Sequence, residues 1–211
     1  MKRVINLDNW NRKEHFKFFS ALDDPFWGIT TTVDFTSVYQ QSKNMEVSLF
    51  LYSVYFLLKC INATTAFKLR IENGEVVEYD KINISPTIGR EDGTFGFGFF
   101  EYDTDLSLFI ENAEKEIHRV KNSAGLSFSK DTARADVIRY SALPWFAFSE
   151  MKHAGSIQTG DSIPKISTGK LIQEKKKLLL PISISVHHGL VDGRNVAEFI
   201  QNLKDGQNNT L

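Results

Sequence analysis

The most restrictive feature of the sequence is an abrupt change of hydrophobic periodicity near its C-terminal end. Residues 178–186 (Leu-Leu-Leu-Pro-Ile-Ser-Ile-Ser-Val) end in the alternation of apolar and polar side chains that is typical of a β-strand. Pro181 predicts an edge position or an irregular start for this strand, because proline donates no ladder hydrogen bond. Apolar residues then recur at helical intervals: Val196, Phe199, Ile200 and Leu203. We therefore expect a strand that passes through a turn into a helix.

The rest of the chain carries both kinds of pattern. Apolar residues at intervals of three and four predict an amphipathic helix over 105–121, and the apolar run at 47–62 predicts a buried helix. Asn73-Gly74 predicts the turn of a hairpin over 67–79. Further patterns predict a helix at 9–16 and strands at 28–33, 94–101 and 137–141. Because strands and helices mix without strict alternation, we expect an α+β fold with a mixed β-sheet flanked by helices.

The length and charge of the chain limit its organisation and its partners. A chain of 211 residues is expected to form a single domain over 1–211. With 25 basic against 26 acidic side chains, no global field favours nucleic acid or an anionic membrane. The most apolar stretch, residues 48–58, is about half the roughly 20 residues that a membrane-spanning helix needs. The single Cys60 and the absence of an apolar signal core predict a cytoplasmic location.

The strongest chemical signal is a pair of adjacent histidines, His187 and His188, in the turn after the predicted strand. Adjacent strand residues face opposite sides, so one ring can reach a cleft while the other packs. A histidine held in one tautomer by local backbone groups can act as a general base. Two other interpretations are a polar strand end and a metal site. Diverging side chains and the lack of a second ligand cluster argue against a metal.

His187-His188-Gly189-Leu190-Val191-Asp192-Gly193 resembles the His-His-x-x-x-Asp-Gly motif of CoA-dependent acyltransferases. Chloramphenicol acetyltransferases, dihydrolipoyl acyltransferase domains and peptide-synthetase condensation domains share this motif, so alone it gives the chemistry without the acceptor. Three further blocks resemble the chloramphenicol acetyltransferase family in order and spacing: Trp10 to Phe16, Ser141-Ala-Leu-Pro-Trp145 and Lys177-Leu-Leu-Leu-Pro181. The resemblance implies a two-layer sandwich fold and a stand-alone acetyltransferase of small molecules.

The resemblance also implies roles for individual residues. His188, the second of the pair, matches the base that takes a proton from the acceptor hydroxyl. Ser141 matches the donor that stabilises the oxyanion, although a strand-end serine can also cap the following turn. Asp192 matches a carboxylate that pairs with Arg12 and has a structural role rather than that of a proton relay. The family uses acetyl-CoA directly in a ternary complex, without an acyl-enzyme, in a homotrimer whose active sites lie between subunits.

Binding residues follow from the same resemblance. Lys170 matches a lysine near the CoA tunnel, and Ser167 matches a hydroxyl residue that orders a water near the intermediate. Phe18, Phe95 and Phe128 match aromatic contacts of chloramphenicol, and each equally fits a core position. Phe19 replaces a family tyrosine, which removes a hydrogen bond to the acceptor or to bound water.

Three alternatives stay open at this point. The acceptor can be another hydroxyl- or amine-bearing small molecule, the protein can be a catalytically silent trimer that only binds, or it can be a lipoyl-type subunit of a larger complex. The intact set of His188, Ser141, Asp192 and Arg12 argues against a silent protein. The remaining histidines and the cysteine (His15, His118, His153 and Cys60) are interpreted as structural, with His153 in a loop.

Overall fold

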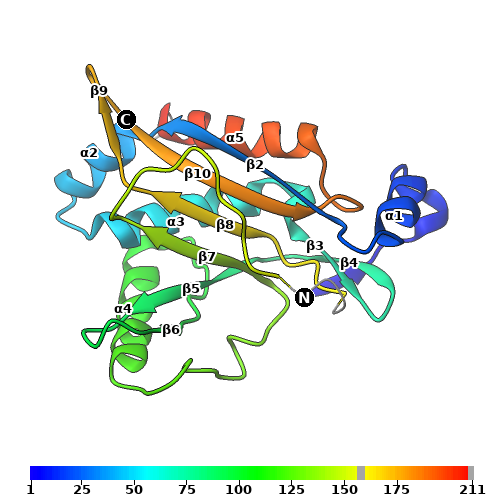
Figure 1. Ribbon diagram of the computed structural model, residues 1–211, viewed down its shortest axis with the longest axis horizontal. Coiled ribbons are helices and arrows are strands. Elements are labelled where there is room, and N and C mark those ends of the chain that lie inside the picture. The colour runs from blue at the N-terminus through cyan, green and yellow to red at the C-terminus, as the bar shows by residue number, and fades with distance from the viewer. Residues whose placement is uncertain (156–159, 209–211) are drawn as a thin grey trace.

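The computed structural model describes residues 1–155 and 160–208 and consists of two β-sheets and five α-helices in that part of the chain (Figure 1). The helices are α1 (Lys13–Ser20), α2 (Thr36–Asn44), α3 (Leu49–Ala63), α4 (Leu106–Lys121) and α5 (Gly193–Asn208), with 3₁₀ turns η1 (Leu7–Asn9) and η2 (Thr65–Lys68). The strands are β1 (Lys2–Val4), β2 (Phe26–Asp34), β3 (Leu69–Glu72), β4 (Glu75–Tyr79), β5 (Asn83–Gly89), β6 (Phe95–Phe97), β7 (Val137–Leu143), β8 (Lys165–Gly169), β9 (Ile172–Glu174) and β10 (Lys177–His187).

The large sheet combines antiparallel and parallel pairs. Its order is β2-β10-β8-β7-β5-β6, and β9 also pairs with β10. The pairs β5–β7 and β7–β8 are parallel, whereas β10 is antiparallel to β2, β8 and β9. The small sheet has the order β1-β4-β3. The expectation of an α+β fold with a mixed sheet flanked by helices is confirmed.

The two faces of the large sheet differ in chemistry. Tyr140, Ile166 and Ile184 lie opposite one another on β7, β8 and β10 and are buried in the hydrophobic core. Helices α2, α4 and α5 contact strands of the large sheet, and α3 contacts each of these three helices. The residues before and after these three point to the other face, since side chains alternate along a strand. That second face is mainly polar and carries Ser141, Ser167 and Ser183. We call it the helix-free face, because the described helices that contact the large sheet pack on the core side.

The elements expected from local patterns are present. The hairpin turns at Asn73 and Gly74, whose positive φ values of 50° and 82° suit the two-residue turn that this pair favours. Asp105 caps α4 by accepting hydrogen bonds from the amides of Ser107 and Leu108. Cys60 is 4% exposed, as a small core residue should be. No helix among the described residues has both the length and the apolar character needed to cross a membrane.

The prediction for Pro181 is wrong. The strand β10 is central, and Pro181 pairs with Thr32 of β2 in a regular register. On its other side β10 pairs with β9 up to Leu179 and with β8 from Ile182. Pro181 therefore sits where the partner strand on this side changes, at a position that is paired with neither β8 nor β9.

Three other sequence predictions need correction in their extent. The strand expected over 94–101 is limited to β6, because the amide of Phe99 donates to the Glu116 carboxylate instead of to a neighbouring strand. The helix expected from residue 9 begins at Lys13, after the separate turn η1. Helix α2 was not predicted, since its sequence (Thr-Ser-Val-Tyr-Gln-Gln-Ser-Lys-Asn) is mostly polar.

Candidate active site

The histidine pair lies where β10 ends and the chain turns toward α5. The carbonyl of His187 accepts hydrogen bonds from the amides of Leu190 and Val191, both at 3.0 Å. The amide of His188 donates to the carbonyl of Pro25 at 2.8 Å, which ties the turn to the start of β2. These bonds hold His188 beside the N-terminal part of the chain.

Aromatic rings enclose the His188 imidazole. Phe19, in α1, stacks on it with ring centroids 3.9 Å apart and planes inclined by 21°. Trp27, in β2, lies 5.3 Å away and is anchored by its indole N–H, which donates to the Val191 carbonyl at 3.0 Å. Nδ1 of His188 is buried and has no hydrogen-bond partner among the described residues. Because the side chain as a whole is only half-buried, Nε2 is the nitrogen left to meet a ligand.

His187 is the packed member of the pair, with 3% of its surface exposed. Its Nδ1 accepts a hydrogen bond from the Gly189 amide at 3.1 Å. Burial lowers the pKa of His187 to about 4, against the opposing effect of Asp161 and with a further lowering from His188. The ring is therefore neutral at pH 7, with its proton on Nε2. The backbone bond that fixes a tautomer thus belongs to His187 and not to His188.

Arg12 and Asp192 form an ion pair that holds the turn between β10 and α5 in place. One oxygen of Asp192 caps α5 by accepting from the amides of Arg194 at 3.0 Å and Asn195 at 3.2 Å. The other oxygen forms an ion pair with Arg12, whose second nitrogen donates to the His188 carbonyl at 3.1 Å. Burial raises the pKa of Asp192, but the Asn195 amide and Arg12 outweigh it, so the net pKa is lowered. None of these bonds reaches the His188 ring.

A second group of polar residues crosses the helix-free face of the large sheet. Thr30, Ser183, Ser167 and Ser141 lie opposite one another on β2, β10, β8 and β7. The Thr87 hydroxyl, on β5, donates to the Ser141 oxygen at 3.3 Å and extends this hydroxyl row by one strand. Because Ser141 accepts that bond, its own hydrogen can be donated to a ligand. Ser141 is half-buried, whereas Ser167 is fully buried.

Exposed aromatic rings lie next to the Ser141 end of the row. Phe97 of β6 lies opposite Thr87 in the register. Phe128 stacks on Phe97 at a centroid distance of 5.5 Å, and Phe95 meets Phe97 edge-on at 5.7 Å. Phe95 and Phe128 are 47% and 70% exposed, so they are not core residues in the single chain. We call these three rings the phenylalanine cluster.

The two remaining binding candidates fall into different groups. Phe18 is exposed on α1 and contacts Phe19 edge-on at 5.1 Å, so both rings belong with His188. Lys170 is exposed just beyond the end of β8, where its amide donates to the Phe146 carbonyl at 2.9 Å. Lys170 therefore lies nearer to Ser141 than to the histidine pair.

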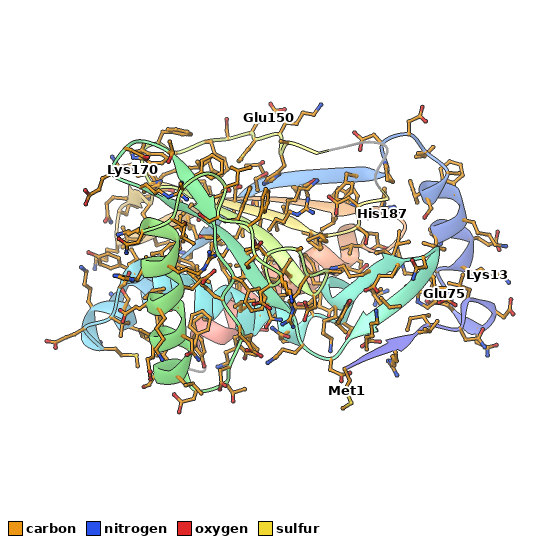
Figure 2. The ribbon with its side chains drawn as sticks, turned by 90° about the horizontal axis from the view of Figure 1, so that it is seen from below. Met1, Lys13, Glu75, Glu150, Lys170 and His187 are labelled. Atoms are coloured by element: carbon orange, nitrogen blue, oxygen red, sulfur yellow. The ribbon has the colours of Figure 1, made fainter. Side chains whose placement is uncertain are left out.

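The fold separates the predicted base from the predicted oxyanion donor. Ser183 is level with Ser141 in the register, and His188 lies five residues further along the chain. At about 3.3 Å per residue this is about 16 Å along the strand, plus about 10 Å across two strands. Figure 2 shows the same separation, with His187 and Lys170 toward opposite ends of the molecule. One chain does not bring His188 and Ser141 into contact with the same reactant.

Two residues that contact the hydroxyl row, His153 and Thr87, were not predicted from the sequence. His153, which we expected to be structural, places Nε2 3.0 Å from the Ser167 oxygen. Thr87 contacts Ser141 across a separation of 54 residues. Neither contact can be predicted from a local sequence pattern, because each joins segments that lie together only in the folded chain.

A cavity of about 740 Å³ opens on the helix-free face between the two groups. His187, His153 and Ser183 are among the residues that line it. Lys165 also lines it, with its ammonium group 4.4 Å from the centre of the Phe26 ring. Within residues 1–155 and 160–208, no three His, Cys, Asp or Glu side chains are grouped so that they could hold a metal.

Comparison with known proteins assigns the family. The family model for chloramphenicol acetyltransferase matches residues 2–204, nearly the whole chain. The chain belongs to the chloramphenicol acetyltransferase family. As a chloramphenicol acetyltransferase family member it is an acyltransferase, which confirms the class expected from the histidine motif.

Individual relatives of this acetyltransferase family member agree with the assignment. Chloramphenicol acetyltransferase 3 of Escherichia coli is 27% identical over 208 residues, covering 98% of this chain and 97% of the relative. A solved chloramphenicol acetyltransferase structure superimposes with a TM-score of 0.89 at 29% identity, covering 97% and 99% of the two chains. The dihydrolipoamide acetyltransferase of Azotobacter vinelandii shares the fold, with a TM-score of 0.67 at 15% identity and coverage of 92% and 85%.

Proposed function

We propose that the protein transfers the acetyl group of acetyl-CoA to a hydroxyl of chloramphenicol or a related small molecule, directly within a ternary complex. The observation that carries this proposal is the half-buried His188, framed by Phe19 and Trp27 and braced through its carbonyl by Arg12. A base must be held in a fixed direction within reach of the proton that it removes. These contacts restrict the imidazole and leave Nε2 available.

Each catalytic residue has a defined role in the proposed transfer. His188 Nε2 takes the proton of the acceptor hydroxyl while the hydroxyl oxygen attacks the thioester carbonyl carbon. The carbonyl electron pair moves onto oxygen, and the Ser141 hydroxyl donates a hydrogen bond to that oxyanion. The carbon–sulfur bond then breaks, and the CoA thiolate takes the proton from His188. Asp192 and Arg12 keep the turn in place and exchange no proton.

We propose that the working enzyme is a homotrimer in which His188 of one subunit faces Ser141 of the next. The proposal is supported by the distance between these two residues within one chain, about 16 Å along the sheet alone. It is also supported by the exposed phenylalanine cluster beside Ser141, since large apolar rings in water favour an interface. A second copy would cover these rings and complete the site.

Acetyl-CoA is assigned to the Ser141 group, and the acceptor is placed between the aromatic rings of the two groups. Lys170 is exposed and is proposed to meet a phosphate of CoA, with Ser167 near the reacting carbonyl. The acceptor is proposed to contact Phe18 and Phe19 from one subunit and Phe95 and Phe128 from the other. Flat apolar rings on both sides suit an aromatic acceptor such as chloramphenicol.

A different acceptor is the second candidate. Phe19 lacks the hydroxyl of the tyrosine that the family resemblance places here, and its ring is occupied in stacking on His188. Asp23 and Asp24 are exposed at the edge of the same region, so they remain hydrated and favour a more polar acceptor. The transfer chemistry is the same for either acceptor.

The test is release of the CoA thiol from acetyl-CoA by the purified protein, with and without chloramphenicol. We expect release that depends on the drug and is lost in His188→Ala. A matched control is His118→Ala, which changes an exposed histidine on α4. Thiol release with other hydroxylated compounds but not with chloramphenicol would move the assignment to the second candidate. No release with any acceptor would contradict the proposed function.

A further inference from the structure

His153 contacts the hydroxyl row from a loop that crosses the helix-free face. Its Nε2 lies 3.0 Å from the oxygen of Ser167, which is fully buried at the centre of β8. The neighbouring Met151 carbonyl accepts a longer bond of 3.4 Å from Ser183, the next member of the row. The loop is therefore fastened to the row at two points, and His153 supplies the shorter bond.

The surroundings of His153 determine its protonation. Burial lowers the pKa of His153, and the nearby Lys165 ammonium lowers it further, so the ring is neutral at pH 7. A neutral imidazole has one N–H donor and one acceptor nitrogen. Nδ1 is buried and has no hydrogen-bond partner among the described residues.

One tautomer fits this arrangement better than the other. With the proton on Nδ1, a buried N–H would have no acceptor, which is the rarer and more costly kind of unsatisfied group. With the proton on Nε2, only a lone pair is left without a partner. His153 is then the donor, and the Ser167 oxygen accepts.

The direction of this bond decides what Ser167 can do. If the Ser167 oxygen accepts from His153, its own hydrogen is available to another acceptor. Ser167 lies directly opposite Ser141 on the same face of the sheet. The Ser167 hydrogen can therefore be directed toward the Ser141 side, where the oxyanion is proposed to form.

We propose that His153 is a positioning residue of the acetyl-transfer site, which donates from Nε2 to Ser167 and thereby makes the Ser167 hydroxyl a hydrogen-bond donor toward the reacting groups. The inference rests on the proposed function for its catalytic effect. The tautomer itself is a property of the folded protein and is independent of turnover.

The first test is therefore spectroscopic. Long-range proton–nitrogen NMR correlations at pH 7 distinguish the two neutral tautomers of each histidine, and the His153 signals are identified by their loss in His153→Gln. We expect a neutral ring with its proton on Nε2, and nitrogen shifts that change in Ser167→Ala. A proton on Nδ1, or a charged ring at pH 7, would overturn the inference.

The second test is kinetic and uses matched variants. His153→Gln keeps an N–H donor near the Nε2 position, whereas His153→Met fills a similar volume without one. We expect the Met variant to lower kcat about fivefold to tenfold, the scale of one lost hydrogen bond, with the KM for acetyl-CoA and the unfolding temperature little changed. The Gln variant should stay within about twofold of wild type.

Combination with Ser167→Ala separates positioning from a purely structural role. If His153 acts through Ser167, His153→Met causes no further loss of kcat in the Ser167→Ala protein. An equal loss in both backgrounds, or no difference between the Met and Gln variants, would overturn the inference. Absence of turnover in the wild-type protein would contradict the proposed function instead, and the tautomer measurement would still decide the role of His153.

Discussion

The ion pair between Arg12 and Asp192 should contribute measurably to the free energy of unfolding, and the variant Arg12→Leu tests this. The Arg12 side chain is 15% exposed and that of Asp192 is 35% exposed. Loss of one partner costs about 3–5 kcal/mol for a fully buried ion pair and about 0–1 kcal/mol for an exposed one. An intermediate pair that also supports the His188 carbonyl should cost about 2 kcal/mol, between these limits.

The corresponding shift in Tm is accessible by circular dichroism. For a chain of this size, about 2 kcal/mol corresponds to about 4–8 °C. All proteins should be compared at one concentration, because subunit association stabilises the folded state. Lys115→Leu is the matched control, since Lys115 and its partner Glu111 on α4 are 66% and 62% exposed. It should shift the Tm by much less.

A double-mutant cycle tests whether Arg12 and Asp192 stabilise the fold as a pair. Asp192→Asn removes the charge but keeps an oxygen that can accept the amides of Arg194 and Asn195. The double variant should therefore be no less stable than the less stable single variant. Additive losses, or a Tm shift for Arg12→Leu no larger than that for Lys115→Leu, would contradict a stabilising ion pair between Arg12 and Asp192.

Ser141, His187 and Cys60 can each be tested by one measurement. Ser141→Ala should lower kcat by about 10²–10³ with little change in KM, because a donor to the oxyanion acts mainly in the transition state; an unchanged kcat in steady-state assays would contradict this role. Burial lowers the pKa of His187 in the folded protein to about 4, from its ordinary value of 6.5. As the pH falls, the unfolded chain therefore binds a proton at His187 before the folded protein does. The free energy of unfolding should fall as the pH drops from about 6.5 to about 4. His187→Asn should lose less Tm than wild type between pH 7.5 and 4.5, and an equal loss would count against this cause. Burial raises the pKa of Cys60 to about 12, so its thiol should react with a disulfide reagent only after unfolding. Rapid reaction of the folded protein would contradict a buried Cys60.

Local patterns were sufficient to predict many elements of the fold. The Asn73-Gly74 hairpin, the amphipathic helix α4 and the change from β10 to α5 each depend on residues that are close in sequence. The backbone preferences and the side-chain periodicity that form these elements involve residues a few positions apart, so both can be recognised in a single sequence. Helix α2 was missed because Val38 and Ser42 are its only buried residues, too few to produce an apolar stripe.

The arrangement of the site depends on contacts that no local pattern contains. The position of Pro181 was misjudged because the change of partner from β9 to β8 is a property of the whole sheet. His153 and Ser167 meet only because a loop returns over β8. The motif around His188 predicted the chemistry, but the distance from His188 to Ser141 emerges only from the register of β10, β8 and β7.

In the proposed homotrimer two copies of the chain build one active site, with His188 from one copy and Ser141 from the other. The most direct test mixes two inactive proteins, His188→Ala and Ser141→Ala, by co-expression or by refolding at equal amounts, and measures thiol release from acetyl-CoA. In a cyclic trimer every mixed assembly contains one interface with both intact residues, so about one quarter of the wild-type rate should return. Separately prepared variants combined without subunit exchange are the control. No recovery in verified mixed trimers would contradict an active site shared between subunits.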